Sequence, residues 1–315
     1  MMDKIAELRN LVDESVRENM CEGILLSGGL DTSIIAVVAS KYNPRLKAFT
    51  VVFGEAPDFE YSRKLSKLLN LEHHILTLSE KNLTANIKPT IEILRSFDPM
   101  EIRNSVAIYS GLKFAKKQVK SVMTGDAGDE LFAGYSFLQK LSKKQLAKYS
   151  KRLYEIMHFS SIKLGEELGI RVKIPYLSEK VKSFAMALNP DLKIKDGVGK
   201  WILRKAFENN LPAEFVWRKK TPIEYGSGTT LLKKVIETSV EDDEFIQKKS
   251  EYKKEGVEIR DKEHMYYYEI YREVVGRIPS SKSNEIKCVG CGGGLSLSTS
   301  YCKLCGATND RHERL

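Results

Sequence analysis

The chain contains 315 residues, of which 42% are hydrophobic and 30% are charged, and its formal net charge at pH 7 is +9. This hydrophobic content is enough for a large core, and the length exceeds that of one average domain. No run of eighteen apolar residues occurs, and the N-terminal residues lack the apolar core of a signal peptide. These features exclude a helical membrane span and an export signal, so we expect a soluble, cytoplasmic protein without a membrane partner.

The first predicted elements are a helix, a strand and a phosphate-binding turn. A charged amphipathic helix is expected over residues 3–19, and the apolar run at 23–26 is typical of a buried strand. The sequence Ser-Gly-Gly-Leu-Asp-Thr-Ser follows at 27–33 and leads into an apolar helix. Glycines in such a turn let backbone N–H groups approach an anion, and the helix start adds further donors. The turn therefore predicts a phosphate site.

The side chains of this turn extend the prediction to a metal ion. Ser27, Thr32 and Ser33 can donate hydroxyl hydrogen bonds to phosphate oxygens. Asp31 would repel a phosphate, so its presence favours a Mg²⁺ ion that bridges the carboxylate and the phosphate. The alternative is an ordinary Gly-Gly turn before a helix.

Strands and helices alternate along the early chain. Strands are expected at 46–53, 73–78 and 119–123, and a helix is expected at 58–69. This succession predicts an α/β fold, in which a parallel sheet is covered by helices on both faces. From about residue 138 the pattern becomes helical.

The segment that begins at residue 97 contains the signals of a helix start. Asp98 suits the N-cap, Pro99 the first helical position and Glu101 the third. The alternative interpretation is that Arg103 or Asn104 faces the active site.

The strand at 119–123 is followed by Thr-Gly-Asp-Ala-Gly-Asp-Glu at 124–130, which holds three carboxylates within five residues. Such crowding is costly unless a cation or a proton compensates it. Asp126 and Asp129 could share a metal ion with Asp31, or one of them could be used for acid–base chemistry. A solvated acidic turn is the alternative.

These motifs resemble those of a known family. Residues 27–33 resemble the pyrophosphate-binding loop of the ATP pyrophosphatases, and residues 125–135 resemble the second signature of the asparagine synthetase and β-lactam synthetase family. Residues 201–220 contain that family's LR, LP and WRxK pattern, and residues 262–268 are similar to its tyrosine-rich helix. The resemblance covers about residues 20–275. It implies an adenine nucleotide α-hydrolase-like sheet with a helical C-terminal part.

The resemblance also implies a reaction. ATP activates a carboxylate as an acyl-adenylate with release of pyrophosphate, and a nitrogen nucleophile then displaces AMP. The protein would thus be an ATP-dependent amide-forming ligase, with aspartate and ammonia as the default substrate pair. Such chemistry requires a cradle for pyrophosphate, a cation beside the transferring phosphorus and a group that accepts a proton from the amine.

The matching positions imply the roles of individual residues. Asp31 and Asp129 would hold Mg²⁺, Lys220 would neutralise the developing charge, and Asp126 would orient or deprotonate the nucleophile. On its own, Lys220 belongs to a basic run of the kind that is usually solvated. The residues expected to bind the pyrophosphate of ATP are Ser27, Gly28, Gly29, Asp31, Thr32 and Ser33.

Two further expectations concern the same site. Arg218 is a second candidate cation because it lies two residues before Lys220. Adenine is expected at the ends of the strands, near Leu25, Val51 and Gly125, because ligands bind there in open α/β sheets.

The chain also departs from the family pattern. Its phosphate loop begins at Ser27, which leaves no room before it for the family's glutaminase domain. We therefore expect nitrogen from free ammonia, from a separate glutaminase subunit or from an amine on the substrate. Arg171, Lys173 and Ser178 replace Glu, Arg and Asp in the family's Glu-x-Arg-x-Pro-Phe-Leu-Asp stretch. If this stretch selects the carboxylate, an analogue of aspartate is the alternative substrate.

Two Cys-x-x-Cys pairs predict a structural zinc site. Cys288 and Cys291 form the first pair, and Cys302 and Cys305 form the second. Four thiolates with this spacing suit a tetrahedral Zn²⁺ ion. Disulfides and a redox role are the alternatives, although the remaining cysteine, Cys21, lies far away and no export signal accompanies them.

These observations predict the domain organisation. The ATP pyrophosphatase domain is expected at 1–278, with its sheet mainly at 20–135 and its helical part at 136–278. A linker is expected at 279–284 and the zinc ribbon at 285–308. The ribbon is too short for a hydrophobic core of its own, so the metal ion would hold it folded.

A basic segment suggests a second functional class. Lys140, Lys144, Lys148 and Arg152 recur every four residues, and no acidic residue occurs at 131–154. This spacing places the four side chains on one helical face, which is usually a solvated face. The alternative is contact with a phosphate backbone, which together with the ribbon would suit a tRNA-modifying adenylating enzyme.

Overall fold

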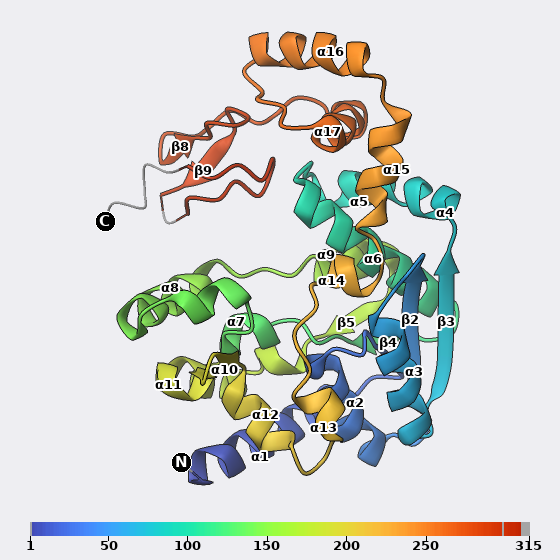
Figure 1. Cartoon of the computed structure of the whole chain (residues 1–315), viewed down its shortest axis with the longest axis vertical. Coiled ribbons are helices and arrows are strands. Elements are labelled where there is room, and N and C mark those ends of the chain that lie inside the picture. Colours follow the sequence, from blue (N-terminus) through green and yellow to red (C-terminus); the bar gives the residue numbers. More distant parts are fainter. Residues whose placement is uncertain (1, 298, 310–315) are drawn as a thin grey trace. The chain divides into compact units, whose positions relative to one another are not determined.

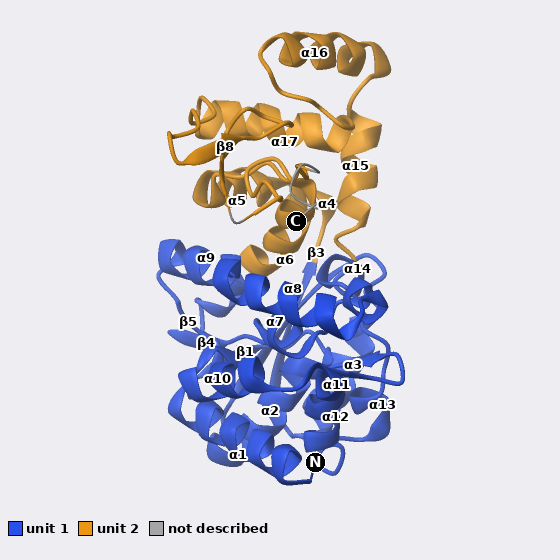
Figure 2. Cartoon of the chain, turned by 90° about the vertical axis from the view of Figure 1, so that its left-hand side faces the viewer, with its two compact units in different colours: residues 1–77, 111–227 blue, residues 78–110, 228–315 orange. Residues whose placement is uncertain are grey.

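A computed structural model of the chain describes residues 2–297 and 299–309. The chain divides into two compact units, which Figure 2 shows in different colours. Unit 1 comprises residues 1–77 and 111–227, and unit 2 comprises residues 78–110 and 228–315. The predicted phosphate loop and the acidic segment lie in unit 1, and the four paired cysteines lie in unit 2.

Unit 1 is built on a five-stranded sheet with the order β3-β2-β1-β4-β5 (Figure 1). The strands are β1 (Gly23–Leu25), β2 (Lys47–Phe53), β3 (Glu72–Leu78), β4 (Ser121–Met123) and β5 (Arg171–Lys173). Strand β1 pairs in parallel with β2 and β4, and β4 pairs in parallel with β5. The strand order reverses at β1, because β2 lies on one side of it and β4 on the other. Such a reversal point is where open α/β sheets bind ligands.

Helices cover both faces of this sheet, as the sequence predicts. On one face, Ile24 and Leu26 belong to the core that also contains residues of α1 (Met2–Glu18) and α2 (Leu30–Tyr42). On the other face, Leu25 and Val51 pack against Gly111 in the last turns of α6 (Pro99–Ala115). Consecutive residues of β1 thus contact opposite layers, which explains the unbroken apolar run.

The rest of unit 1 is largely helical, in agreement with the pattern after residue 138. Its longer helices are α3 (Asp58–Leu68), α8 (Lys143–Ile156), α9 (Ser160–Leu168) and α10 (Glu179–Ala187). Its shorter helices are α7 (Gly128–Phe132), η1 (Ser136–Lys140), η2 (Pro175–Leu177), α11 (Pro190–Lys193), α12 (Trp201–Phe207), α13 (Ala213–Val216) and α14 (Ile223–Gly226). A two-stranded sheet is formed by β6 (Ile194–Lys195) and β7 (Val198–Gly199).

Two features differ from the sequence predictions. Residues 171–173 form the edge strand β5, whose basic side chains Arg171 and Lys173 are exposed and give no apolar signal. Charged side chains are common on edge strands because they discourage pairing with other chains. The four basic residues at 140, 144, 148 and 152 also do not share one helix as predicted. Lys140 is the last residue of η1, and α8 begins at Lys143 after a capping box formed by Ser142.

The other three of these basic residues lie on the outer face of α8. The buried residues of α8 are Leu146, Ser150 and Tyr154. The basic residues at 144, 148 and 152 each lie two positions away, which is about 200° of rotation around a helix. Three of the four predicted residues therefore share a face opposite the core.

Unit 2 is helical and ends in the small sheet of the ribbon. Its helices, besides the start of α6, are α4 (Glu80–Ala85), α5 (Ile87–Leu94), α15 (Leu231–Ser239), α16 (Asp242–Lys254) and α17 (Lys262–Val274). The strands β8 (Glu285–Lys287) and β9 (Gly294–Ser296) pair in antiparallel fashion. No helix in the described ranges is long and apolar enough to cross a membrane.

The start of α6 follows the predicted capping pattern. The Asp98 carboxylate accepts the N–H of Met100 at 3.2 Å, and Pro99 is the first residue of the helix. The Glu101 carboxylate accepts the hydroxyl of Ser105 at 3.0 Å. Within the same unit, Arg103 pairs with the buried carboxylate of Glu263 on α17 at 2.5 Å. These contacts support the structural interpretation of this segment.

A buried lysine predicts how stability depends on pH. Lys193 on α11 is 3% exposed, and its Nζ donates to the Tyr154 hydroxyl. Burial lowers the pKa of Lys193 from 10.5 to about 7. Between these two pH values the unfolded chain binds more protons at this site than the folded chain, so stability rises with pH. Below pH 7 both states are protonated and the full cost of burying the charge remains.

We expect Lys193→Met to remove this pH dependence. The variant should be more stable than the wild type near neutral pH, because it buries no charge. Its advantage should shrink as the pH rises towards about 9.5, by at most about 1.4 kcal/mol per pH unit. Urea unfolding of both proteins between about pH 7 and 9.5 measures this difference. An advantage that stays constant over this range would contradict the assigned pKa.

Candidate active site and metal centre

The predicted phosphate loop connects β1 to α2 at the reversal point of the sheet. Gly28 has a φ of 78°, and a Cβ there would lie 2.6 Å from the backbone oxygen of Asp58. Glycine is therefore required at this position. The hydroxyls of Ser27 and Thr32 lie 3.1 Å apart, and Ser27 Oγ accepts the N–H of Gly29 at 3.2 Å. Helix α2 begins at Leu30, so its first turn contains Asp31 and Ser33.

The acidic segment after β4 lies directly against this loop. A Cβ on Gly125 would lie 2.8 Å from Thr32 Cγ2, and a Cβ on Gly128 would overlap the Asp31 carboxylate. Both glycines thus permit a close approach that side chains would prevent. As a result, the carboxylates of Asp31 and Asp129 share a single ammonium group.

That ammonium belongs to Lys200, a residue that the sequence analysis did not single out. Lys200 Nζ lies 2.5 Å from Asp31 Oδ2 and 2.7 Å from Asp129 Oδ1. Lys220 Nζ lies 2.6 Å from the other oxygen of Asp129, Oδ2. The ring of Tyr135 lies beneath Lys220, with 4.4 Å between Nζ and the ring centroid. The structure therefore brings together Asp31, Asp129 and Lys220 as predicted and adds a fourth charged group.

Burial and neighbouring charges set the protonation of this cluster. Burial raises the pKa of Asp31, and Lys200 partly offsets this rise. Burial alone would also raise the pKa of Asp129, but Lys200 and Lys220 lower it to about 2. Burial would lower the pKa of Lys200, but the two carboxylates raise it. At neutral pH, Asp129 and Lys200 are consequently charged.

Two polar atoms of the loop are left without partners. Asp31 Oδ1 and Ser33 Oγ are buried and have no hydrogen-bond partner in the described part of the chain. Buried polar atoms are rarely unpaired, and such atoms in a phosphate loop indicate a bound group. Mg²⁺ prefers oxygen ligands such as a carboxylate oxygen beside a phosphate loop, so the residues present fit this ion.

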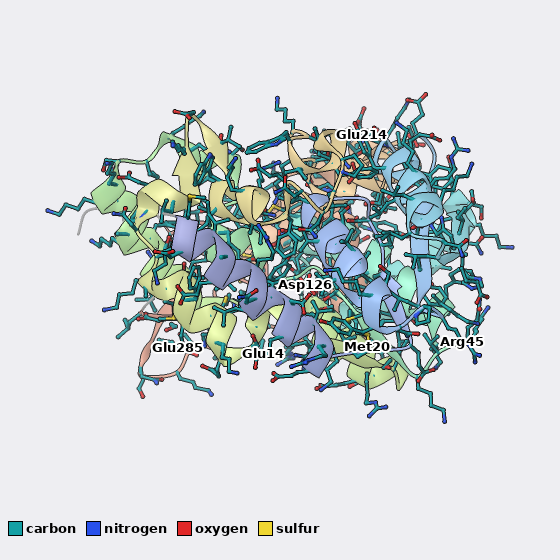
Figure 3. The ribbon with its side chains drawn as sticks, turned by 90° about the horizontal axis from the view of Figure 1, so that it is seen from below. Glu14, Met20, Arg45, Asp126, Glu214 and Glu285 are labelled. Carbon is teal, nitrogen blue, oxygen red and sulfur yellow. The ribbon has the colours of Figure 1, made fainter. Side chains whose placement is uncertain are left out.

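Asp126 is held by two hydroxyl groups rather than by lysines. Its Oδ2 accepts hydroxyl hydrogen bonds from Thr124 at 2.8 Å and from Ser161 at 2.5 Å. Burial raises the pKa of Asp126, and these two hydroxyls partly oppose the rise. In Figure 3, Asp126 lies near the middle of the view, whereas Arg45 and Glu214 lie near its edge.

Arg218 supports the loop from outside the acidic cluster. Its guanidinium pairs with the Asp58 carboxylate and donates to the Gly28 carbonyl oxygen at 2.7 Å. The guanidinium carbon also lies 3.8 Å from the ring centroid of Tyr61. The positive charge of Arg218 is thus already compensated by Asp58, a residue that the sequence analysis did not assign to the site.

Arg204, the arginine of the LR pattern, helps to position Lys200 and Lys220 beside the loop. Arg204 Nε donates to the Gly199 carbonyl oxygen at 3.0 Å, and its Nη1 donates to the carbonyl oxygens of Val216 and Arg218. The buried guanidinium thereby fixes the backbone before Lys220. Lys200 is fixed nearby, because its N–H donates to the Phe132 carbonyl oxygen at 3.0 Å.

The residues expected near adenine lie at the last residue of β1, two residues before the end of β2 and two residues after β4. Leu25 and Val51 are partly exposed and contact the same glycine of α6, and Gly125 lies against Thr32. Their placement at the reversal point of the sheet agrees with the rule for open α/β sheets. Adenine binding by these residues stays a prediction.

The four paired cysteines form a cluster in unit 2. Their sulfur atoms all lie within 4.8 Å of one another, and all four residues are buried. The sulfur atoms of Cys288 and Cys305 are 3.7 Å apart, and those of Cys291 and Cys302 are 3.8 Å apart. The chain reverses after each pair at a glycine with a φ of 74°, Gly292 and Gly306. Four thiol ligands around one point fit a tetrahedral zinc ion.

Comparisons with known proteins agree with this geometry. The family model for asparagine synthase matches residues 7–169 and 163–284. A glutamine-hydrolysing asparagine synthetase of Gallus gallus is 30% identical over 295 residues, which cover 85% of this chain and 52% of the relative. Asparagine synthetase B of Escherichia coli (strain K12) is 29% identical over 268 residues, which cover 76% of this chain and 48% of the relative. The chain spans about half the length of these curated relatives.

A search of solved structures found an NMN synthetase from Francisella tularensis. It has a TM-score of 0.32 and 15% sequence identity to this chain. The match covers 74% of this chain and 94% of that chain.

The acidic cluster predicts that Lys200 is required for stability. In Lys200→Met, the Asp31 carboxylate would lose its lysine partner, and the Asp129 carboxylate would keep only Lys220. We expect a loss of about 3–5 kcal/mol in the free energy of unfolding, the usual cost of removing one partner from a buried ion pair. Urea unfolding at pH 7 measures it. Lys143→Met is a matched control, because it breaks an ion pair between side chains that are 75% and 50% exposed. Equal stability of the two variants would contradict the role given to Lys200.

Proposed function

Because the chain belongs to the asparagine synthase family, we propose that it adenylates a carboxylate with ATP, releases pyrophosphate and forms an amide with a nitrogen nucleophile. Aspartate and ammonia are the proposed substrates, and a separate glutaminase subunit is an alternative source of nitrogen. One observation carries this proposal. Asp31, Asp129, Lys200 and Lys220 converge beside the phosphate loop at 27–33.

The loop and the two lysines are assigned to the leaving pyrophosphate. Backbone N–H groups at the start of α2 and the unpaired Ser33 hydroxyl bind its oxygens. Lys220 is partly exposed, so its ammonium can leave Asp129 and follow the charge that develops on phosphorus. Lys200 is fully enclosed and keeps the carboxylates in place. The loop therefore binds pyrophosphate, while Lys220, which can move, and Lys200, which is fixed, compensate its negative charge.

Asp31 and Asp129 are assigned to hold Mg²⁺, with the unpaired Asp31 Oδ1 as one ligand atom. The ion supplies positive charge next to the triphosphate of ATP when it is bound. Arg218 acts as a positioning residue, because it joins the loop carbonyl of Gly28 to Asp58.

Asp126 is assigned to the nitrogen nucleophile. A general base works best when its pKa lies near the working pH, and burial moves the pKa of Asp126 upward from that of an exposed carboxyl. Thr124 and Ser161 hold the carboxylate by their hydroxyls, which fixes its orientation. Asp126 can therefore accept the proton that the amine loses when the amide forms.

A second candidate, adenylation of tRNA, is favoured by one feature of unit 1. The outer face of α8 carries Lys144, Lys148 and Arg152, and the exposed rings of Phe137 and Tyr149 meet beside it with centroids 5.4 Å apart. Basic and aromatic side chains on one surface suit a nucleic acid strand. The amide-forming function is preferred because the family match covers the catalytic segments.

The first experiment measures pyrophosphate release from ATP and Mg²⁺ by the purified chain. We expect stimulation by aspartate plus ammonium, with asparagine as the product. Stimulation by bulk tRNA alone would contradict the proposed function and favour the second candidate. A reaction without either addition reports the background hydrolysis of ATP.

Two variants test the site assignment. Asp31→Asn and Lys220→Met should each slow pyrophosphate release by about 100-fold or more, because each removes charge stabilisation of the transition state. Lys219→Met is the matched control, since Lys219 is the exposed neighbour of Lys220. Similar rates in Lys219→Met and Lys220→Met would contradict the role of Lys220. Circular dichroism of each variant separates a catalytic loss from unfolding.

A further inference from the structure

The second cysteine pair is bonded to the segment that precedes α6. Three consecutive carbonyl oxygens, those of Lys303, Leu304 and Cys305, accept hydrogen bonds from elsewhere in unit 2. The donors are Ser96 Oγ at 2.7 Å, the Phe97 N–H at 2.8 Å and Arg260 Nη2 at 2.9 Å. The backbone between the ligands Cys302 and Cys305 is therefore fixed by unit 2 as well as by its own turn.

The cap of α6 is part of the same contact. The Tyr301 hydroxyl donates to the carboxylate of Asp98, which caps α6 through the N–H of Met100. Gly306 follows Cys305 directly, and a Cβ at this position would overlap the Asp98 carboxylate. Asp98 is 3% exposed, so Tyr301 supplies a partner to a buried carboxyl group. The residues on both sides of the second pair thus hold the helix cap.

Phe97 extends this contact into the core of unit 2. Its side chain is fully buried, and its ring lies between the rings of His264, Tyr268 and Tyr271 on α17, with centroid distances of 5.3, 5.0 and 5.1 Å. Because Leu304 accepts the Phe97 N–H, residues 302–305 are bonded directly to the backbone that carries this ring.

The first cysteine pair is bonded to the same segment as Arg260. The Gly290 carbonyl oxygen, between Cys288 and Cys291, accepts the Glu258 N–H at 2.7 Å. Both cysteine pairs are thus attached to residues 258–260, and the second pair is also attached to residues 96–98. An ion that joins the two pairs would therefore reinforce the link between residues 96–98 and residues 258–260.

We propose that metal binding by the four cysteines acts as a clasp on unit 2, because it fixes the cap of α6 and the aromatic core around Phe97. The ribbon is then an integral part of this unit. Since metal binding and the clasp contacts stabilise each other, weakening one must weaken the other by the same factor. This inference concerns unit 2 and is independent of the proposed reaction.

Hydrogen exchange of the full chain tests the proposal directly. Zinc-loaded protein is compared with protein from which zinc has been removed by a chelator. We expect faster exchange in peptides covering residues 97–102 as well as in the ribbon, with unchanged protection of β1 and β2 in unit 1. Faster exchange confined to residues 285–309 would overturn the proposal.

Zinc affinity provides a second readout that holds even if the metal-free chain unfolds completely. Tyr301→Phe leaves all four cysteines in place but removes the hydroxyl that Asp98 accepts. We expect about tenfold weaker zinc binding in competition with a chromophoric chelator, because a hydrogen bond to a buried carboxylate is lost. Tyr266→Phe is the matched control, since the Tyr266 hydroxyl forms no hydrogen bond within the described part of the chain. Equal zinc affinities of the two variants would overturn the proposal.

Discussion

The candidate site depends on one electrostatic constraint, the burial of Asp31 and Asp129 against a shared ammonium group. Two carboxylates this close together are unfavourable unless positive charge lies between them. Lys200 provides that charge from inside, at 2.5 and 2.7 Å, and Lys220 adds a second contact from the partly exposed side. Gly125 and Gly128 follow from the same constraint, because a side chain at either position would push the acidic segment away from the loop.

The sheet explains why segments distant in sequence meet at this point. Strands β1 and β4 are parallel neighbours, so the loops after them leave the same edge of the sheet. The chain then returns twice to this edge, once with Lys200 and once with Arg218 and Lys220. Arg204 joins these two returns, because it donates to the carbonyl oxygens of Gly199 and Arg218. The hydrogen bonds of Arg204 thus link the LR motif to the WRxK motif.

Local signals account for the parts of the structure that the sequence predicts. The apolar run of β1, the glycines of the loop and the Asp98 cap act within a few residues, so their sequence signatures are complete. Lys200 has no such signature, because its place depends on a positive φ of 56° after β7 and on a bond to Phe132. Strand β5 escapes prediction for a related reason, since its pairing with β4 comes from the sheet rather than from its own basic residues.

The two clusters of ligand atoms solve the problem of crowded negative charge in different ways. In the acidic pair, Lys200 and Lys220 already compensate the carboxylates, so burial of this pair requires no metal ion. In the cysteine cluster, the sulfur atoms face one another at 3.7 and 3.8 Å, and deprotonated thiols at this distance require a bound cation. An ion held there is a lasting part of the fold. The chemistry of the ligands thus distinguishes the carboxylate pair, which lysines already neutralise, from the cysteine cluster, which needs a cation once its thiols are deprotonated.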